Sequence, residues 1–203
     1  MKTEVIPTSD PRALEKALEV LRQGGLAAFP TDTVYGVAAD LNQPRAIQRL
    51  YEAKGRDAGK AIAVLIGSAE QIEQVTSGLN EQAAQLAARF WPGALTLVLP
   101  KRQGLPESLS ALPTVGVRMP DHPFALAILR AAGPLAVTSA NRSGQSSPQT
   151  VEEVLAQLEG YIELVLDGGR CPGGVPSTVV DCSGAEVAVL RQGAIPAEEI
   201  INT

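Results

Sequence analysis

Residue types that carry common enzyme chemistry are scarce in this chain. Histidine occurs once, as His122, and cysteine twice, as Cys171 and Cys182. Two cysteines do not make a disulfide framework, and their spacing fits no zinc ribbon, so we expect no metal site built by the protein. A Ser-His or Cys-His catalytic pair would need His122, which precedes Pro123 where a helix is expected to begin. A helix start is the favoured interpretation of that position.

Aromatic residues and long apolar runs are also rare. Phe, Trp and Tyr make up only 3% of the chain, so the core must consist mainly of Ala, Val, Leu and Ile. The longest apolar runs, such as residues 94–99, are far too short to span a bilayer. The first residues lack the apolar core and cleavage site of a signal peptide. We therefore expect a cytoplasmic protein with no membrane association.

Basic residues are also outnumbered by acidic ones. The net charge is −5, the pI is near 5.0, and no run of Lys and Arg occurs. Broad electrostatic attraction to nucleic acid is therefore not expected, although a local positive patch stays open. The chain also lacks the GxxxxGK[ST] loop and the GxGxxG fingerprint, so separated side chains would have to hold any nucleotide.

What the chain does contain is an alternation of helix and strand signals over 203 residues. The pattern predicts an α/β fold, with one domain over residues 1–203 and a twisted, mostly mixed sheet flanked by helices. The sheet must be mixed because the last strands are too close in sequence for helical crossovers. Capping boxes are expected at Ser68 with Gln71 and at Thr150 with Glu153. Helices are expected near 10–24, 44–54, 68–75, 80–91, 123–132, 150–158 and after Pro196, and strands at 26–29, 61–66, 94–99, 114–118, 135–139, 161–166, 177–182 and 186–190.

Polar residues recur where the predicted strands end or begin. They are Thr31 to Thr33, Arg118, Ser139 to Asn141, Ser177 and Arg191. Because ligands bind in the crevice at strand ends of α/β sheets, we expect these residues to meet there. Each also has a plainer interpretation. A capping turn would explain Ser139 to Asn141, and a salt bridge to a nearby carboxylate would explain Arg118.

Two further segments suggest an anionic ligand. Lys54, Arg56 and Lys60 surround Gly55 at a predicted helix end, which favours a phosphate or carboxylate partner, and a solvated surface loop is the alternative. In residues 168–174, Gly173 and Gly174 would let backbone N–H groups approach an anion closely, and a wide hairpin loop is the alternative.

Seven short motifs in one order resemble the threonylcarbamoyl-AMP synthases of the YrdC-like family, in their short form. They are PTDTVYG (30–36), KGRDAGK (54–60), WPGALT (91–96), VGVRMPDHP (115–123), TSANRSG (138–144), PSTVVD (176–181) and LRQG (190–193). The resemblance covers about residues 24–200, without the C-terminal extension domain of the long form. It implies a concave positive cleft and the conversion of L-threonine, bicarbonate and ATP into threonylcarbamoyl-AMP and pyrophosphate. A partner transferase complex then modifies the tRNA adenosine beside the anticodon, which leaves room for a weak direct contact with tRNA.

The same resemblance implies roles for individual residues. Threonine would contact Thr33, Arg118, Val137 and Ser177. ATP, with Mg²⁺, would contact Arg56, Lys60, Thr114, Ser139, Ser147 and Arg191. The catalytic group would be Lys54, Arg56, Ser139 and Asn141, with Lys54 and Asn141 beside bicarbonate and the phosphates. Asp32 is the best protein-side candidate for Mg²⁺, although a turn-capping role is favoured. Leu65 stands where some longer members have histidine, which puts a polar contact with threonine there in question.

Two other functions stay open at the level of sequence. A carbamoyl-transfer module would share the domain, but the acylphosphatase-like and zinc-finger segments of such proteins have no counterpart here. A noncatalytic RNA-binding module is disfavoured by the acidic charge and the few aromatics. Threonine-dependent release of pyrophosphate would separate the enzyme from the RNA-binding module.

Overall fold

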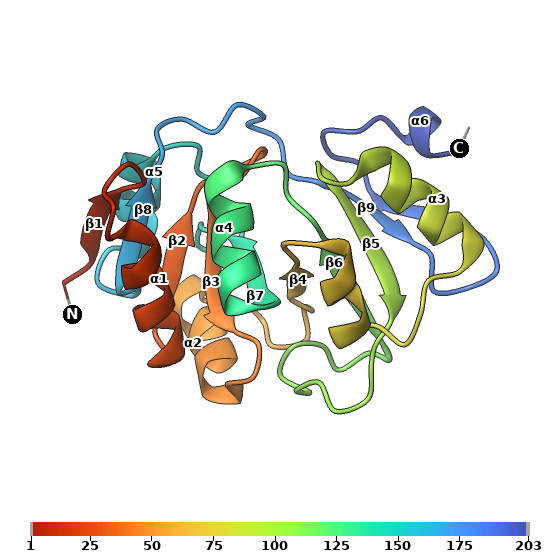
Figure 1. Cartoon of the computed structure of the whole chain (residues 1–203), viewed down its shortest axis with the longest axis horizontal. Coiled ribbons are helices and arrows are strands. Elements are labelled where there is room, and N and C mark those ends of the chain that lie inside the picture. Colours follow the sequence, from red (N-terminus) through yellow and green to blue (C-terminus); the bar gives the residue numbers. More distant parts are fainter. Residues whose placement is uncertain (1, 202–203) are drawn as a thin grey trace.

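The computed structural model describes residues 2–201 and has at its centre one mixed sheet of ten strands (Figure 1). The strand order is β1-β8-β2-β3-β7-β4-β6-β5-β9-β10. This confirms the predicted α/β class. The strands are β1 (Glu4–Pro7), β2 (Ala27–Phe29), β3 (Gly36–Asp40), β4 (Ala63–Leu65), β5 (Leu95–Pro100), β6 (Thr114–Arg118), β7 (Leu135–Ser139), β8 (Leu164–Asp167), β9 (Thr178–Asp181) and β10 (Ala188–Arg191).

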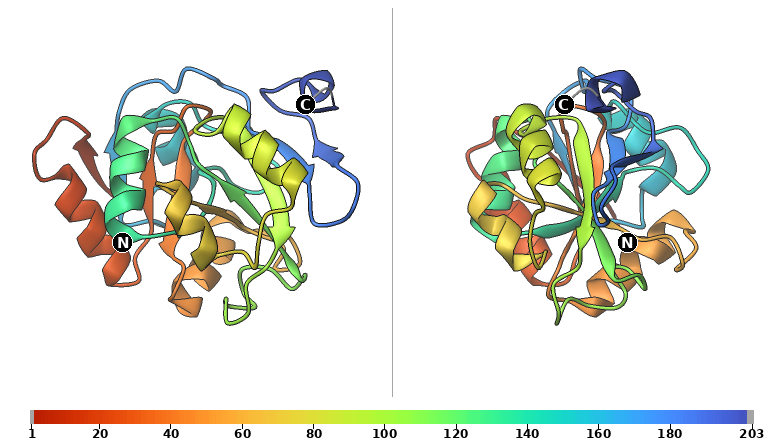
Figure 2. Two further views of the ribbon diagram at one scale, coloured as in Figure 1. Left: turned by 45° about the vertical axis from the view of Figure 1, so that its right-hand side comes forward. Right: turned by 90° about the vertical axis from the view of Figure 1, so that its right-hand side faces the viewer.

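The helices cover parts of both sheet faces (Figure 2). They are α1 (Ala13–Arg22), α2 (Pro44–Lys54), η1 (Ala69–Gln74, a 3₁₀ helix), α3 (Glu81–Phe90), α4 (Pro123–Ala132), α5 (Val151–Leu158) and α6 (Ala197–Ile201). Several ends follow the expected chemistry. Gly55 closes α2 in the left-handed conformation with φ 56°, and the Asn80 side chain caps α3 by accepting from the Ala83 N–H.

One predicted helix start and two predicted capping boxes need correction. Helix α1 begins at Ala13 rather than after Asp10, whose carboxylate instead accepts from the Arg12 N–H. The Ser68 side chain makes no capping bond, and the side-chain oxygen of Gln71 accepts from the Gly67 N–H, so neither half of the predicted box is formed. At α5, Thr150 caps the helix as predicted. The Glu153 carboxylate completes no box there, since it accepts from the Gln149 N–H.

Two strands were not predicted. Strand β1 is a four-residue edge strand with mostly exposed side chains, so it has no apolar alternation to detect. Strand β3 begins at a glycine, is rich in alanine, and follows the 30–35 turn directly. Its burial comes from antiparallel pairing with β2 and β7 rather than from local propensity.

The two faces of the sheet are covered differently. On one face, α1 and α4 pack over the half of the sheet around β2, β3 and β7, with Phe29, Ala38 and Leu135 in that layer. The other face packs against α2, α3 and α5 along most of its width, and Val64, Leu97 and Val117 belong to that larger core. Beyond α4 the first face is left open over β4, β6, β5 and β9, and this open region becomes the candidate site.

Within residues 2–201, every helix is too short or too polar to be a candidate for crossing a membrane.

Candidate active site

A cavity of about 300 Å³ lies over the open part of the sheet. Its floor is made of alternate residues on neighbouring strands, including Ala63, Val98 and Gly116, which are small enough to leave space above them. A Cβ atom at Gly116 would come within 3.2 Å of a Thr96 methyl carbon, so the Thr96 side chain uses the space that the glycine leaves. The site is thus on the face of the sheet, with strand ends at its rim, and not only at strand ends as predicted.

The charge of the cavity wall is entirely positive. Arg56, Arg118 and Arg191 line it, and within residues 2–201 no acidic side chain does. Burial lowers the pKa of Arg191 below its ordinary value, and repulsion by Arg56 lowers it further. Burial also lowers the pKa of Arg118, with Asp32 opposing the shift and Arg191 adding to it. Because Arg56, Arg118 and Arg191 all line one cavity, the three guanidinium groups can act on one anionic ligand.

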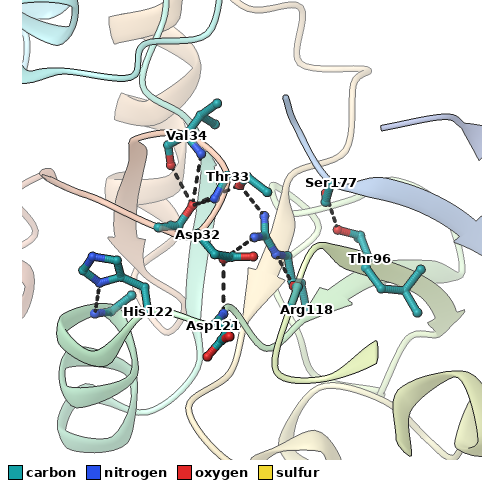
Figure 3. Close-up of polar contacts among 12 residues, drawn as sticks. Asp32, Thr33, Val34, Thr96, Arg118, Asp121, His122 and Ser177 are labelled. Carbon is teal, nitrogen blue, oxygen red and sulfur yellow. Dashed lines mark hydrogen bonds and ion pairs between the residues drawn. The ribbon is translucent and has the colours of Figure 1, made fainter. Parts of the chain in front are cut away.

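Arg118 is held by every nitrogen of its side chain (Figure 3). Nε donates to the Gly93 carbonyl at 2.9 Å, Nη1 to Thr33 Oγ1 at 2.9 Å, and Nη2 to Asp32 Oδ1 at 2.5 Å. The predicted alternative, a salt bridge to a nearby carboxylate, is therefore present. It coexists with a place in the cavity wall, because Arg118 and Thr33 both line the cavity.

Hydroxyl groups surround the arginines. Ser177 Oγ and Thr96 Oγ1 are 2.8 Å apart (Figure 3). Arg191 Nη2 donates to the Ser177 carbonyl at 2.8 Å. Ser139, at the end of β7, and Ser147, in the loop before α5, also line the cavity. The hydroxyl residues that line the cavity are Thr31, Thr33, Thr96, Thr138, Ser139, Ser147 and Ser177. Hydroxyls and guanidinium groups together suit carboxylate and phosphate oxygens.

Lys54 lies behind the cavity wall rather than in it. Its side chain is almost fully buried, and Nζ donates to the main-chain carbonyls of Ser139 and Asn141. The Lys54 carbonyl in turn accepts from the Ser143 N–H at 2.8 Å. Lys54 therefore clamps the 139–143 turn onto the end of α2, two residues before Arg56. In this structure it shapes the wall and does not present its amine to the cavity.

Burial lowers the pKa of Lys54 to about 7, with repulsion from Arg56 as the second cause. The neutral amine still has two N–H groups, enough for both carbonyls.

The lowered pKa of Lys54 predicts a pH dependence of stability. Between about pH 7 and the ordinary lysine range, Lys54 is protonated in the unfolded chain and neutral in the folded protein. We therefore expect the free energy of unfolding to rise over this interval by a contribution that Lys54→Met lacks. Urea unfolding of both proteins from pH 6 to 10 measures it, and parallel pH curves would contradict the shift.

Asn141 is buried beside the same turn. Its Nδ2 donates to the carbonyls of Arg142 and Gln145, both at 2.8 Å, while Oδ1 has no hydrogen-bond partner. The predicted alternative, in which Asn141 bonds to the backbone of its own turn, is therefore correct for the amide nitrogen. The unpartnered oxygen is a buried acceptor next to Lys54 and Ser139, where a proton donor would satisfy it.

Two predicted ATP residues lie outside the cavity wall. Lys60 is exposed, and its local bonds are made by the main chain: the carbonyl accepts from Tyr51 and from Arg56 Nε, and the N–H donates to the Asp57 carbonyl. Thr114 begins β6 on the same face as Gly116 and Arg118, but it does not line the cavity. The predicted cluster around Gly55 thus separates into a buried lysine, a cavity arginine and an exposed lysine.

The glycine-rich segment does not offer free N–H groups. Gly173 donates to the Asp32 carbonyl at 3.1 Å, and Gly174 donates to the Thr33 carbonyl at 2.8 Å. A Cβ at Gly173 would lie 2.6 Å from the Asp32 oxygen, so glycine is needed for this close approach. The buried Tyr35 hydroxyl also donates to the Gly169 carbonyl. The anion-cradle interpretation is therefore wrong, and the segment secures the threonine-rich turn.

His122 and Asp32 both have structural partners (Figure 3). His122 Nδ1 accepts from the Ala125 N–H at 3.4 Å at the start of α4, and burial lowers its pKa. The favoured helix-start interpretation is confirmed. Asp32 does not line the cavity, and its Oδ1 accepts from Arg118 and from the Asp121 N–H. It braces the site from outside rather than capping its own turn.

Thr31 lines the cavity, as expected of the polar strand-end cluster at residues 31–33. Two other cavity residues were not predicted as site residues: Thr96 was only part of a motif, and Thr138 was only a neighbour of a predicted position. Alternation along the strands could have found Thr96, because it shares its face with Val98. Leu65, which stands where some longer members of the family have histidine, lines the cavity as an apolar contact.

The donor set does not suit a resident metal ion. The cavity offers guanidinium, hydroxyl and apolar groups, whereas Mg²⁺ prefers carboxylate and phosphate oxygens. Within residues 2–201 no cluster of three or more His, Cys, Asp or Glu side chains is placed to hold one. Mg²⁺ would have to arrive on the phosphates of a ligand.

The fold and the site together define an α/β protein with a positively charged cavity on the open face of its sheet, suited to a small anionic ligand. The sequence model of the Sua5/YciO/YrdC family, described as "Telomere recombination", matches residues 19–193, and the chain belongs to this family. It is 44% identical over 201 residues to the threonylcarbamoyl-AMP synthase of Bacillus subtilis, covering 98% of this chain and 58% of that protein. It is also 44% identical over 182 residues to the Pyrococcus abyssi protein of the same name, covering 89% and 54%.

A solved structure agrees with these relatives. The crystal structure of P. abyssi Sua5 complexed with L-threonine superimposes with a TM-score of 0.90 and 43% identity, covering 93% of this chain and 56% of that one. The present chain thus spans a little over half the length of these relatives. The fold and family are shared over nearly its whole length.

Proposed function

We propose that the protein is an L-threonylcarbamoyladenylate synthase, a nucleotidyltransferase that makes threonylcarbamoyl-AMP and pyrophosphate from L-threonine, bicarbonate and ATP. The observation that carries this proposal is the convergence of Arg56, Arg118 and Arg191 in one cavity without a lining carboxylate. All three substrates bring anionic groups, so an acidic protein needs such a site to hold them together. Support also comes from the names of the curated relatives and from the threonine-bound relative.

Threonine fits the part of the cavity around Arg118. The guanidinium would pair with the substrate carboxylate, and the hydroxyls of Thr33 and Ser177 lie on the same wall. Val137 and Leu65 add apolar surface for the substrate methyl group. This arrangement agrees with the roles that the resemblance assigns to Thr33, Arg118, Val137 and Ser177.

ATP fits the side of the cavity that carries Arg56 and Arg191. The hydroxyls of Ser139 and Ser147 belong to the same wall and would contact phosphate or ribose oxygens. Arg56 is held in place by bonds to the Lys60 and Ala61 carbonyls, so its guanidinium is pre-positioned. Lys60 and Thr114 would take part only if ATP extends beyond the cavity rim.

The chemistry needs no protein nucleophile. The threonine amine attacks the bicarbonate carbon, and loss of water leaves a carbamate. A carbamate oxygen then attacks the α-phosphorus of ATP, forming the acyl–phosphate bond while the bond to pyrophosphate breaks. Arg56, Arg118 and Arg191 would place the reactants and offset their repulsion, and orientation of this kind contributes up to about 7–11 kcal/mol. Mg²⁺ would accompany the ATP phosphates.

Downstream, a threonylcarbamoyl transferase complex would consume the product by acylating a tRNA adenosine next to the anticodon. The acidic net charge of −5 gives little attraction for tRNA itself, so we propose at most a weak direct contact.

Val137→Ala should lower the preference for threonine over serine. Val137 lines the cavity, and a Cβ at Gly36 would lie only 2.9 Å from its methyl carbon, so the valine is closely seated. Loss of one methyl contact is worth about 1–3 kcal/mol, so we expect discrimination in kcat/KM to fall by about ten-fold. The KM for ATP serves as internal control and should stay constant. An unchanged threonine-to-serine ratio would remove Val137 from the specificity pocket.

The proposed function is tested by pyrophosphate release with each substrate omitted in turn. Turnover should require ATP, threonine and bicarbonate together. Carbamoyl phosphate replacing bicarbonate and threonine would indicate the carbamoyl-transfer alternative instead. Salt-sensitive binding of RNA without any turnover would indicate the RNA-binding alternative.

A further inference from the structure

Asp32 occupies an unusual place beside the cavity. It lies between Thr31 and Thr33, which both line the cavity, yet its own side chain does not. That side chain is only 15% exposed. Its main-chain oxygen is bonded to the Gly173 N–H, so the backbone of Asp32 is held as firmly as its carboxylate.

The Asp32 carboxylate joins three segments of the chain. Oδ1 accepts from Arg118 Nη2 at 2.5 Å and from the Asp121 N–H at 3.2 Å (Figure 3). The turn after β2, the end of β6 and the start of α4 therefore meet at one oxygen atom. The roles carried by the resemblance leave this carboxylate outside the threonine, ATP and catalytic sets.

The number of N–H groups that Arg118 already uses explains what its contact with Asp32 achieves. A guanidinium has five N–H groups, of which one each is taken by Gly93, Thr33 and Asp32. Two N–H groups remain, one on each terminal nitrogen. Two is the number that a carboxylate needs for a bidentate contact.

We infer that Asp32 is a positioning residue that holds the Arg118 guanidinium so that its two remaining N–H groups face the threonine carboxylate. This inference rests on the proposed function, because it names threonine as the ligand of Arg118. Asp32 also balances the charge of Arg118, whose side chain is only 8% exposed, before substrate arrives. Without this carboxylate the guanidinium would keep two anchors but lose the one that fixes Nη2.

The test uses Asp32→Ala and Asp32→Asn, each made in the wild type and in an Arg118→Ala background. Pyrophosphate release gives the KM values for threonine and ATP. Asp32→Ala should raise the threonine KM by about ten-fold, the scale of a lost hydrogen bond to a charged group, and leave the ATP KM within about two-fold. Asp32→Asn should have a smaller effect, because the amide oxygen still accepts from Arg118 and Asp121. In the Arg118→Ala background, Asp32→Ala should add no further loss.

Asp121→Ala is the matched control. It removes an exposed carboxylate from the adjoining loop but keeps the N–H that bonds to Asp32, so the threonine KM should not change.

Three results would overturn the inference while the wild type remains active. Additive losses in the double variant would mean that Asp32 acts independently of Arg118. Tighter threonine binding in Asp32→Ala would mean that Asp32 competes with the substrate. Equal rises in both KM values with a lower melting temperature would mean a general role in the turn. Absence of threonine-dependent turnover in the wild type would instead overturn the proposed function, and this inference with it.

Discussion

Arg118→Ala raises the KM for threonine by about 100-fold and leaves the KM for ATP nearly unchanged. Truncating one partner of a buried charged pair costs about 2–5 kcal/mol, and here the guanidinium would be the partner of the substrate carboxylate. Arg56 and Arg191 line the same cavity and stay in place to hold ATP. Steady-state pyrophosphate release with each substrate varied gives both constants.

Arg130→Ala provides the control for the Arg118 experiment. Arg130 also donates to a main-chain carbonyl, that of Gly67, but it lies on α4 outside the cavity wall. Its removal should leave both KM values unchanged. Similar losses for threonine and ATP in Arg118→Ala would show that Arg118 supports the fold of the whole site instead of binding one substrate.

Lys54→Met abolishes most of the turnover and also destabilises the protein. Methionine keeps the length of the side chain but cannot donate to the carbonyls of Ser139 and Asn141. Each buried carbonyl left without its donor costs about 1–3 kcal/mol. Because Ser139 lines the cavity and Arg56 follows two residues after Lys54, a relaxed turn displaces groups on two sides of the site. We expect kcat to fall by about 100-fold or more, since small misplacements of reactants cost that much.

Lys101→Met separates this effect from the general loss of a lysine clamp. Lys101 donates to the Ser110 carbonyl at 2.6 Å, the same kind of contact, in a loop outside the cavity. It should lower the free energy of unfolding with little change in kcat. Near-normal turnover of folded Lys54→Met at saturating substrates would show that the 139–143 turn holds its shape without Lys54.

The fold was predictable where local patterns are strong. Helices with an apolar stripe and a clear cap, such as α2 ending at Gly55, came close to their observed bounds. Strand β3 could not be found this way, because an alanine-rich segment gains its strand conformation only from its two neighbours in the sheet. Ser68 and Gln71 fit a capping pattern, but the Gln71 side chain instead bonds to nearby Gly67 and to the distant Leu129 carbonyl.

The candidate site was predictable in its residue types and less so in its geometry. Arg118, Ser177 and Arg191 converge as the strand-end pattern indicated. The burial of Lys54 could not be read from sequence, because a lysine at a helix end is usually solvated. The N–H groups of Gly173 and Gly174 were misjudged for a related reason, since only tertiary structure shows that Asp32 and Thr33 already use them. Family resemblance supplied the identity of the substrates, which polar patterning alone could not.

The account is tested most directly by mass spectrometry of the product formed from ATP, Mg²⁺, threonine and ¹³C-labelled bicarbonate. If the arginine-lined cavity joins all three substrates, an acyl adenylate containing both threonine and the labelled carbon should appear, and it should vanish when threonine is withheld. An adenylate that forms without threonine, or one that lacks the label, would contradict the account.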